Sequence, residues 1–502
     1  MFNESNGFLV TFLEVMSALF VFAIGAAVLV VVVLYIIDVT QTKHAIRRNF
    51  PVIGRFRYFF EHLGEFFRQY FFAMDREELP FNRAERSWVY RAAKNLNNTM
   101  AFGSTRDVRR VGTVLFVNSP FPVRDEEAIA PAELTIGPNT RQPYTTNSLF
   151  NVSAMSYGAI SRPAVQALSH GAAKAGAWIN TGEGGLASHH LSGGADIVFQ
   201  IGTAKYGVRT LDGRLDENKL RDMVAHDEVK MIELKLSQGA KPGKGGILPG
   251  IKVSEEVAAI RGIPVGQDSN SPNRHAEINS ADDLLDFVNR IRDVSGKPVG
   301  FKAVLGGYGW LNELCERIVS RGIEHAPDFI TVDGGDGGSG AAPMALMDNV
   351  GLPLRESLAL LIDALQQHDL KDHVKVIASG KLITPVEVAW AYAMGADFVA
   401  SARGNMFALG CIQALQCNRN TCPTGITTHD EDLQKGLVPA EKAERVAHYI
   451  ENLVHEVEII AHSCGAREPR ELRREYARIV TPSGQSIALD ELYPYQNSAK
   501  VA

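Results

Sequence analysis

Short apolar runs alternate with longer amphipathic stretches between about residues 150 and 430. Each short run has the length of a strand, and each longer stretch repeats its apolar positions at helical spacing, so the pattern predicts repeated strand–helix units. Eight such runs predict a closed parallel (β/α)8 barrel, the TIM-barrel fold of the α/β class. The predicted strands are Phe150–Ala154, Trp178–Thr181, Ile197–Ile201, Met231–Lys235, Val299–Ala303, Phe329–Asp333, Val374–Ala378 and Phe398–Ser401.

A different pattern begins the chain, because Val15–Ile37 carries no charge. A helix of this length, at ~1.5 Å per residue, crosses a ~30 Å hydrocarbon core, so we predict a single-pass transmembrane helix. Acidic residues precede the run and Asp38 follows it, which disfavours a cleaved signal peptide. The positive-inside rule places everything after residue 38, including the barrel, on the cytoplasmic side of the inner (cell) membrane. The basic residues behind this prediction are Lys43, Arg47, Arg48, Arg55 and Arg57.

Aromatic residues alternate irregularly with Arg, His and Glu from Phe50 to Phe72. This composition suits helices that lie against lipid headgroups, and it equally suits a collar packed on the barrel. The predicted division is a membrane segment (1–40), an aromatic and basic juxtamembrane region (41–80), a pre-barrel segment (81–149), the barrel (150–430) and a C-terminal helical cap (431–502).

Charge and cysteine usage narrow the functional classes. The net charge of -6 and pI of about 6.2 provide no basic field, so a nucleic-acid partner is not expected. Three of the five cysteines, Cys411, Cys417 and Cys422, are spaced Cys-x5-Cys-x4-Cys-Pro. Three thiolates with a following proline favour an iron–sulfur loop. A zinc site needs a fourth ligand, such as Cys315, Cys464 or a histidine, and three buried cysteines are the remaining interpretation.

The cysteine run resembles the three-iron, four-sulfur (3Fe-4S) ligand loop in the FMN-binding synthase domain of glutamate synthases. Other segments resemble that family in the same order, and together they cover about residues 81 to 465. They are Met155–Ser161, Asn180–Gly185, Gln238–Gly246, Leu248–Val253 and Gly335–Gly340. The resemblance implies FMN and a 3Fe-4S cluster held by Cys411, Cys417 and Cys422.

The predicted loops after the strands supply candidate cofactor contacts. Gly335–Gly340 fits G-x-G-x-x-G, but Ala-Ala-Pro-Met follows it, so a Rossmann site is rejected in favour of close backbone approach to a flat cofactor. The loops after strands seven and eight suit one phosphate group, and Lys302 suits the pyrimidine edge of reduced flavin. With the resemblance, the expected FMN contacts are Met155, Ser156, Lys302, Asp333, Gly335, Gly337, Gly338, Gly380, Lys381, Ala402, Arg403 and Gly404.

Substrate contacts are expected on two loops. Gln238, Lys241 and Lys252 belong to a lysine- and glycine-rich loop suited to an anion, which the resemblance identifies as 2-oxoglutarate. Arg274 and His275 lie where the family usually has Pro-Pro-His-His, so another acid is also possible here.

Proton transfer is expected from Glu183, with Lys235 nearer the substrate than Lys302. A carboxylate there can deprotonate an incoming ammonium and help expel water before the flavin reduces the imine. His189 and His190 are the alternative proton carriers.

The leading hypothesis is an FMN and iron–sulfur oxidoreductase that aminates 2-oxoglutarate or a related 2-oxo acid without its own glutaminase domain. It needs a ferredoxin-like or reductase-type electron donor, and it takes free ammonia, another amine or nitrogen from a separate amidotransferase subunit. The alternative is a membrane-associated flavin dehydrogenase that oxidises an amino or N-alkyl amino acid. A non-catalytic membrane-tethered scaffold is a third possibility, which the cysteines and Glu183 disfavour.

Overall fold

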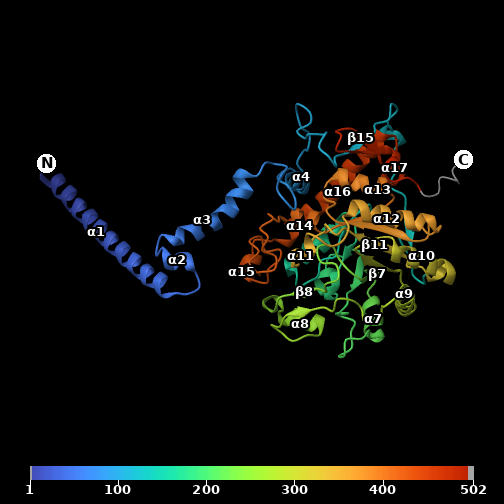
Figure 1. Ribbon diagram of the computed structural model, residues 1–502, viewed down its shortest axis with the longest axis horizontal. Coiled ribbons are helices and arrows are strands. Elements are labelled where there is room, and N and C mark those ends of the chain that lie inside the picture. Colours follow the sequence, from blue (N-terminus) through green and yellow to red (C-terminus); the bar gives the residue numbers. More distant parts are fainter. Residues whose placement is uncertain (1–2, 496–502) are drawn as a thin grey trace. The chain divides into compact units, whose positions relative to one another are not determined.

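The computed structural model describes residues 3–495. These residues form two compact units that meet in the chain between Ala84 and Glu85. The first unit contains α1 (Asn3–Thr40), α2 (Ala45–Asn49), α3 (Gly54–Phe67) and the π-helix η1 (Arg68–Phe72) (Figure 1). Within α1, the stretch Gly7–Thr40 is long and apolar enough to cross a membrane, and its most apolar part is not buried. The predicted span of residues 15–37 lies inside it.

The second unit is built on a closed barrel of eight parallel strands, as the sequence predicts. Neighbouring strands pair in the order β4–β5–β6–β7–β10–β11–β12–β13, and β13 pairs back to β4. All eight predicted strands are present with ends shifted by at most a few residues. Their bounds are β4 (Phe150–Val152), β5 (Ile179–Asn180), β6 (Ile197–Ile201), β7 (Val229–Lys235), β10 (Val299–Ala303), β11 (Phe329–Asp333), β12 (Lys375–Ser379) and β13 (Phe398–Ser401).

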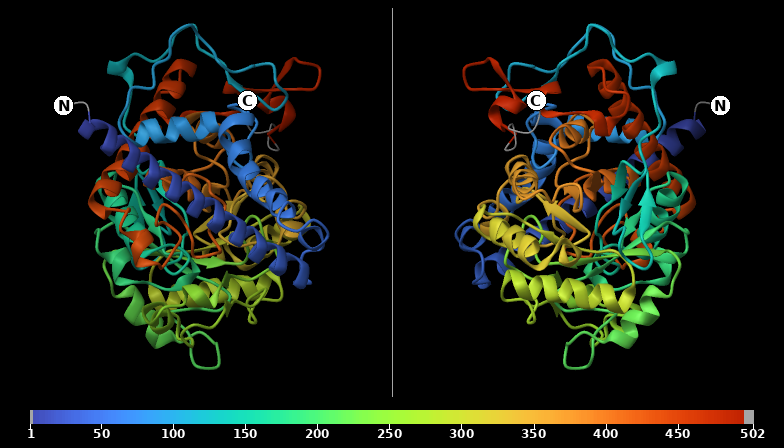
Figure 2. Two further views of the ribbon diagram at one scale, coloured as in Figure 1. Left: turned by 90° about the vertical axis from the view of Figure 1, so that its left-hand side faces the viewer. Right: turned by 90° about the vertical axis from the view of Figure 1, so that its right-hand side faces the viewer.

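Helices form an outer layer around the strands (Figures 1 and 2). Several begin at a residue whose side chain accepts an amide hydrogen bond, as Ser161, Asp216 and Ser280 do. The long α16 packs against α5, α13 and α14. These helices are α5 (Arg162–Lys174), α6 (Ser188–Leu191), α7 (Glu217–Val224), α8 (Glu255–Arg261), α9 (Ala281–Ser295), α10 (Gly309–Arg321), α11 (Met344–Met347), α12 (Leu354–Gln367), α13 (Pro385–Ala393), α14 (Arg403–Leu409), α15 (Glu431–Gln434) and α16 (Pro439–Cys464).

Apolar side chains fill the N-terminal end of the barrel. Trp178, Phe329 and Phe398 pack there against Ile136 and Tyr144 of a hairpin formed by β2 (Leu134–Ile136) and β3 (Tyr144–Thr146). This hairpin comes from the pre-barrel segment and covers the strand ends opposite the expected site. The core therefore stabilises one end of the barrel and leaves the other for chemistry.

A buried polar layer lies above this core. The Glu233 carboxylate of β7 accepts hydrogen bonds from Asn180 at 2.9 Å, Gln200 at 2.6 Å and Thr331 at 2.5 Å. These bonds link β7 to β5, β6 and β11. A fully satisfied buried network of this kind fixes its members in one arrangement. The strand ends that carry the site are thereby held rigidly.

The remaining elements lie outside the barrel. A three-stranded sheet joins β1 (Val114–Phe116) to β14 (Ala477–Val480) and β15 (Ser486–Ala488), so the C-terminal region contains strands as well as the predicted helices. The other short elements are α4 (Arg83–Ala93), η2 (Asp125–Glu127), η3 (Gly182–Gly184), β8 (Ile247–Leu248), η4 (Gly250–Lys252), β9 (Ser269–Asn270), η5 (Ile323–His325), η6 (Pro469–Glu471), η7 (Arg474–Tyr476) and α17 (Leu489–Leu492).

Candidate functional site

A cavity of about 450 Å³ lies at the C-terminal ends of the barrel strands. Every strand, or the loop directly after it, contributes to the lining, which is the usual position of a TIM-barrel active site. In strand order these contributions are Ser153, Glu183, Gln200, Lys235, Lys302, Asp333, Ser379 and Ser401.

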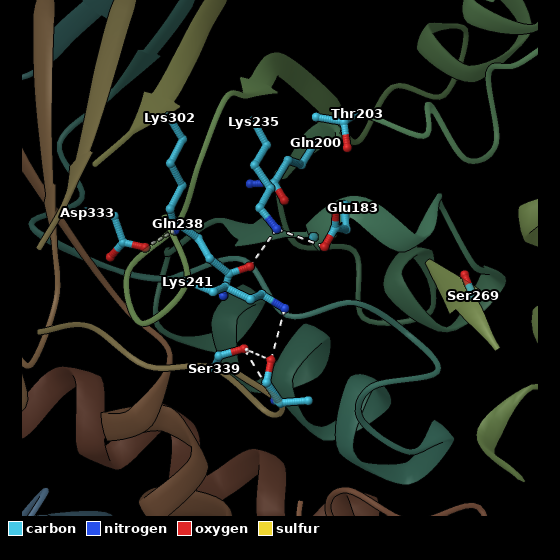
Figure 3. Close-up of polar contacts among 12 residues, drawn as sticks. Glu183, Gln200, Thr203, Lys235, Gln238, Lys241, Ser269, Lys302, Asp333 and Ser339 are labelled. Carbon is cyan, nitrogen blue, oxygen red and sulfur yellow. Dashed lines mark hydrogen bonds and ion pairs between the residues drawn. The ribbon is translucent and has the colours of Figure 1, made fainter. Parts of the chain in front are cut away.

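An ion pair between Glu183 and Lys235 lies in this lining (Figure 3). The Lys235 ammonium donates to Glu183 Oε1 at 2.8 Å and to Gln238 Oε1 at 2.5 Å. Burial raises the pKa of Glu183, but the charges of Lys235, Lys241 and Arg261 outweigh burial and hold that pKa below its usual range. Glu183 is therefore an ionised acceptor, and Lys235 is the hydrogen-bond donor next to it.

Glu183 owes its position to two close backbone approaches. Gly182 has φ +63, and a Cβ on it would lie 2.5 Å from the Ser156 amide nitrogen. Gly246 faces the Glu183 carboxylate so closely that a Cβ would collide with it. Gly182 therefore has no room for a side chain, and any side chain at Gly246 would displace the Glu183 carboxylate.

Three further cations face the same cavity. Lys241 donates to the Ala341 carbonyl, Lys252 to the Ala159 and Cys417 carbonyls, and Arg261 to Ser269 and the Tyr157 carbonyl. Within the described residues, none of the three has a carboxylate partner in ion-pair range. Burial lowers the pKa of both Lys241 and Lys252 to about 8. Buried cations without a carboxylate in direct contact are costly, so this region is suited to an anionic ligand.

Lys302 and Asp333 form a second buried pair at 3.1 Å (Figure 3). Burial lowers the pKa of Lys302, but the Asp333 and Glu233 carboxylates outweigh it and raise the pKa above its usual value. Asp333 also accepts the Gly239 amide at 3.0 Å, which ties the loop after β7 to β11. Lys302 therefore stays charged beside the cavity.

The loops after β12 and β13 offer unused donors. Gly380 has φ +128 and Lys381 has φ +53. In the part of the chain that the structure describes, the amides of Gly380, Lys381 and Ala402 donate to no protein acceptor. All three residues line the cavity together with Arg403. Free backbone amides with two cations beside them fit a phosphate group, so this end of the cavity suits FMN.

The glycine run after β11 has two functions. Gly338 lines the cavity, and a Cβ there would collide with the Arg403 guanidinium. Gly335 and Gly337 do not line it; their amides donate to the Leu352 and Gly334 carbonyls and shape the loop. Gly404 is likewise outside the lining, and its amide donates to Ser401 Oγ at 3.3 Å. Met155 and Ser156, also expected near FMN, do line the cavity.

The three clustered cysteines line one wall of the cavity. Burial raises the pKa of Cys411 to about 11, while Cys422, despite burial, has its pKa lowered by the hydrogen bond with Thr424. Among residues 3–495, no group of three or more His, Cys, Asp and Glu side chains has the geometry to hold a metal ion. The thiols are the right donors for an iron–sulfur cluster, but their present arrangement is not that of a ligand set.

Two expected substrate residues lie away from the cavity. His275 is buried behind Lys235, where Nε2 contacts the Lys235 carbonyl at 3.0 Å and burial lowers the pKa to about 4. Arg274 is exposed and does not line the cavity. His189 and His190 also bond elsewhere, to Glu256 and to the Ala187 amide. A neutral His275 fits a role in positioning Lys235.

Arg261 is a site residue that the sequence did not reveal. It is the last residue of α8, and its side chain is almost completely buried with Nε unsatisfied. Basic residues are common in the last turn of a helix before a glycine, so the sequence gives no sign that Arg261 belongs to the site. The sequence also does not identify Gln200 as a site residue, because the position of a polar residue in a strand does not show whether its side chain points into the barrel or outward.

Comparison with known proteins identifies the family. A family profile described as a conserved region in glutamate synthase matches residues 119–467. The chain is 40% identical over 520 residues to the glutamate synthase large subunit-like protein YerD of Bacillus subtilis, covering 95% of this chain and 98% of YerD. It is 33% identical over 330 residues to the archaeal glutamate synthase [NADPH] of Methanocaldococcus jannaschii, covering 65% of this chain and 61% of that protein.

A third relative, the glutamate synthase large subunit-like protein of Rhizobium meliloti, is 28% identical over 419 residues, covering 79% of this chain and 90% of the relative. Among solved structures, the monotopic membrane protein (S)-mandelate dehydrogenase aligns with a TM-score of 0.46 at 13% identity, covering 74% of this chain and 89% of that one. The chain thus spans about three fifths of the archaeal enzyme and nearly all of YerD. From the profile match and the YerD match, the chain belongs to the glutamate synthase family.

Proposed function

We propose that the chain is an FMN-dependent oxidoreductase of glutamate synthase type that aminates 2-oxoglutarate or a related 2-oxo acid. The observation that supports this most is the charge of the cavity. Its carboxylates are Glu183 and Asp333, and cations clearly outnumber them. The cations of the lining are Lys235, Lys241, Lys252, Arg261, Lys302, Lys381 and Arg403. A flavin phosphate and a dicarboxylic acid together supply the anionic groups that such a lining requires.

The cations divide between two ligands. Lys381, Arg403 and the free amides after β12 and β13 are proposed to hold the FMN phosphate, with Lys302 at the pyrimidine edge. Lys241 and Arg261 have no carboxylate partner within the described residues, and they are proposed to hold the carboxylates of the 2-oxo acid. This assignment leaves the Glu183–Lys235 pair beside the substrate carbonyl.

The pair then moves the protons of the amination. Ionised Glu183 takes a proton from the incoming ammonium, and the free amine adds to the carbonyl carbon to give a carbinolamine. Lys235 protonates the departing hydroxyl, so that water leaves and a protonated imine remains. Glu183 then returns the proton it took to Lys235, to which it is hydrogen-bonded. Reduced FMN, when bound, supplies the hydride that converts this imine to the amino acid.

Further components follow from the family and remain part of the proposal. Cys411, Cys417 and Cys422 are proposed to hold a 3Fe-4S cluster after their thiolates converge. Electrons come from a separate ferredoxin-like or reductase-type protein. Nitrogen comes from free ammonia or a separate amidotransferase subunit. Helix α1 is proposed to cross the inner membrane once, with the barrel in the cytoplasm, because the basic residues follow α1.

A second candidate function is favoured by α1. A membrane-associated flavin dehydrogenase would use the same cavity in the opposite direction: Glu183 accepts a proton from the substrate amine, and electrons pass to a membrane or protein acceptor. Membrane attachment has an evident use for that reaction, whereas an enzyme that aminates a soluble 2-oxo acid does not require it.

Anaerobic spectroscopy of the purified chain separates the two. In the first experiment, the oxidised enzyme is mixed with glutamate, N-methylglutamate and other amino acids. In the second, the chemically reduced enzyme is mixed with 2-oxoglutarate and ammonium. The proposal expects reoxidation of the reduced flavin, with glutamate formed, only when both 2-oxoglutarate and ammonium are present. Bleaching of the oxidised flavin by an amino acid, followed by its reoxidation with a quinone, would contradict the synthase proposal and support the dehydrogenase.

A further inference from the structure

The chain from Asp38 to Tyr58 forms a compact turn at the end of α1. The buried Asp38 carboxylate accepts the Val52 amide at 3.0 Å and forms an ion pair with Arg55 at 2.8 Å. Val52 has φ +67, a conformation that a β-branched residue rarely adopts. Since Asp38 binds the amide of that residue, its carboxylate holds the turn in this conformation.

Two other contacts fix the direction in which α3 leaves the turn. A Cβ on Gly54 would lie 2.7 Å from the Ile46 carbonyl oxygen, so α2 and α3 approach more closely than any larger residue permits. The Arg47 guanidinium lies 4.7 Å from the centroid of the Tyr58 ring. The turn therefore connects α1 to α3 as a defined joint.

One side of α3 and η1 is apolar and exposed. At 100° per residue, Phe56, Phe59, Phe60, Leu63, Phe66 and Phe67 share one face of α3. Phe56, Phe59, Phe60 and Phe66 each keep more than half of their surface exposed, and Phe71 of η1 does so too. Isolated exposed apolar residues are common, but a continuous aromatic face marks an interaction surface.

Charges flank this aromatic face. Arg57 and Glu61 lie on the other side of α3, Arg68 begins η1, and Lys43, Arg47 and Arg48 lie in the turn. A helix with aromatic residues on one face, preceded by a turn rich in basic residues, suits the boundary between headgroups and acyl chains of an anionic membrane. Only residues 41–53 separate α1 from α3 in the chain, so α3 must lie close to the end of the proposed membrane span.

We propose that α3 and η1 lie in the headgroup layer of an anionic phospholipid bilayer, with the aromatic face toward the acyl chains. Asp38 acts as a positioning residue that sets the angle between this interfacial helix and α1. The proposal rests on the membrane location of α1 given above. Packing of the same face on a protein surface is the competing outcome.

Tryptophan substitutions in the full chain test the membrane contact. Phe60→Trp, Glu61→Trp and Phe22→Trp are reconstituted separately into vesicles that contain phosphatidylglycerol, with bromine at a shallow or a deep acyl carbon. Emission is read as the difference from the parent chain. We expect at least twofold stronger quenching of Phe60→Trp by shallow bromine than of Glu61→Trp, the matched control one residue along. Phe22→Trp should respond to deep bromine.

The outcomes distinguish the two membrane statements. If Phe22→Trp is quenched and Phe60→Trp is not, the interfacial helix is wrong while the span stands. If Phe22→Trp is unquenched, the span is wrong.

For Asp38, the double variants Asp38→Ala/Phe60→Trp and Asp38→Ala/Phe22→Trp are compared. Quenching should fall in the first and stay unchanged in the second; unchanged quenching in the first would refute the positioning role.

Discussion

In the proposed reaction, proton transfer depends on Glu183 being charged while it is surrounded by cations. Replacing it by glutamine keeps the shape of the side chain and removes the acceptor. We expect Glu183→Gln to lose amination of the 2-oxo acid by about 10²-fold or more, the usual size of a general acid–base contribution. Flavin content should stay full. The measurement is single-turnover reoxidation of reduced flavin with 2-oxoglutarate and ammonium.

Lys302→Ala is the matched comparison for Glu183→Gln, since it removes a buried charge from the other side of the same cavity. It should lower flavin affinity or shift the flavin spectrum. If Glu183→Gln loses flavin as Lys302→Ala does, then Glu183 has a structural role rather than a role in proton transfer.

A pH dependence follows from Lys241, whose pKa is lowered to about 8 by burial. Below pH 8 the side chain is charged and can bind an anionic substrate; as pH rises through 8 the charge is lost and binding weakens. We therefore expect KM for the 2-oxo acid to rise above pH 8 while kcat changes less. Lys241→Arg should extend the low-KM range upward, because arginine keeps its charge. A KM that is flat from pH 7 to 9.5 would contradict this role.

At the scale of elements, the loop after α14 brings Cys411, Cys417 and Cys422 to one cavity wall. If they hold a three-ligand cluster, each thiolate is required individually. Cys417→Ser should lose most iron while retaining flavin, and Cys464→Ser, a buried cysteine outside the cavity, should retain both. Iron, zinc and flavin are measured after anaerobic purification. Stoichiometric zinc without iron would eliminate the cluster.

The elements were predictable to different degrees, for physical reasons. The eight barrel strands are short apolar runs with buried faces, so composition alone located them. Residues directly after strands, such as Glu183 and Lys381, then had to lie at one end of the barrel. Arg261 and His275 come from the longer stretch between β7 and β10, whose path depends on tertiary contacts such as that of His275 with the Lys235 carbonyl. No local pattern encodes such a path.

At the scale of the whole molecule, the nitrogen source depends on whether any thiol can hydrolyse an amide. Burial raises the pKa of Cys315 to about 12 and of Cys464 to about 11, and neither lines the cavity. The remaining three cysteines are the ones proposed above to hold the cluster. Amide hydrolysis needs an activated nucleophile. We therefore expect glutamine to serve the purified chain no better than equimolar ammonium, measured as glutamate formed. A clear preference for glutamine would contradict this.

Attachment to the membrane is also a property of the whole chain. If α1 crosses the bilayer, its apolar length is in contact with acyl chains, and neither high salt nor alkaline washing can release it, because these treatments weaken charge interactions and leave hydrophobic burial intact. We expect the chain to stay with washed membranes and to leave them in detergent. Since the basic residues from Lys43 onward follow α1, protease added to intact spheroplasts should spare the barrel, and protease added to inverted vesicles should digest it. Digestion in intact spheroplasts would reverse the orientation, and release by salt would leave only peripheral binding.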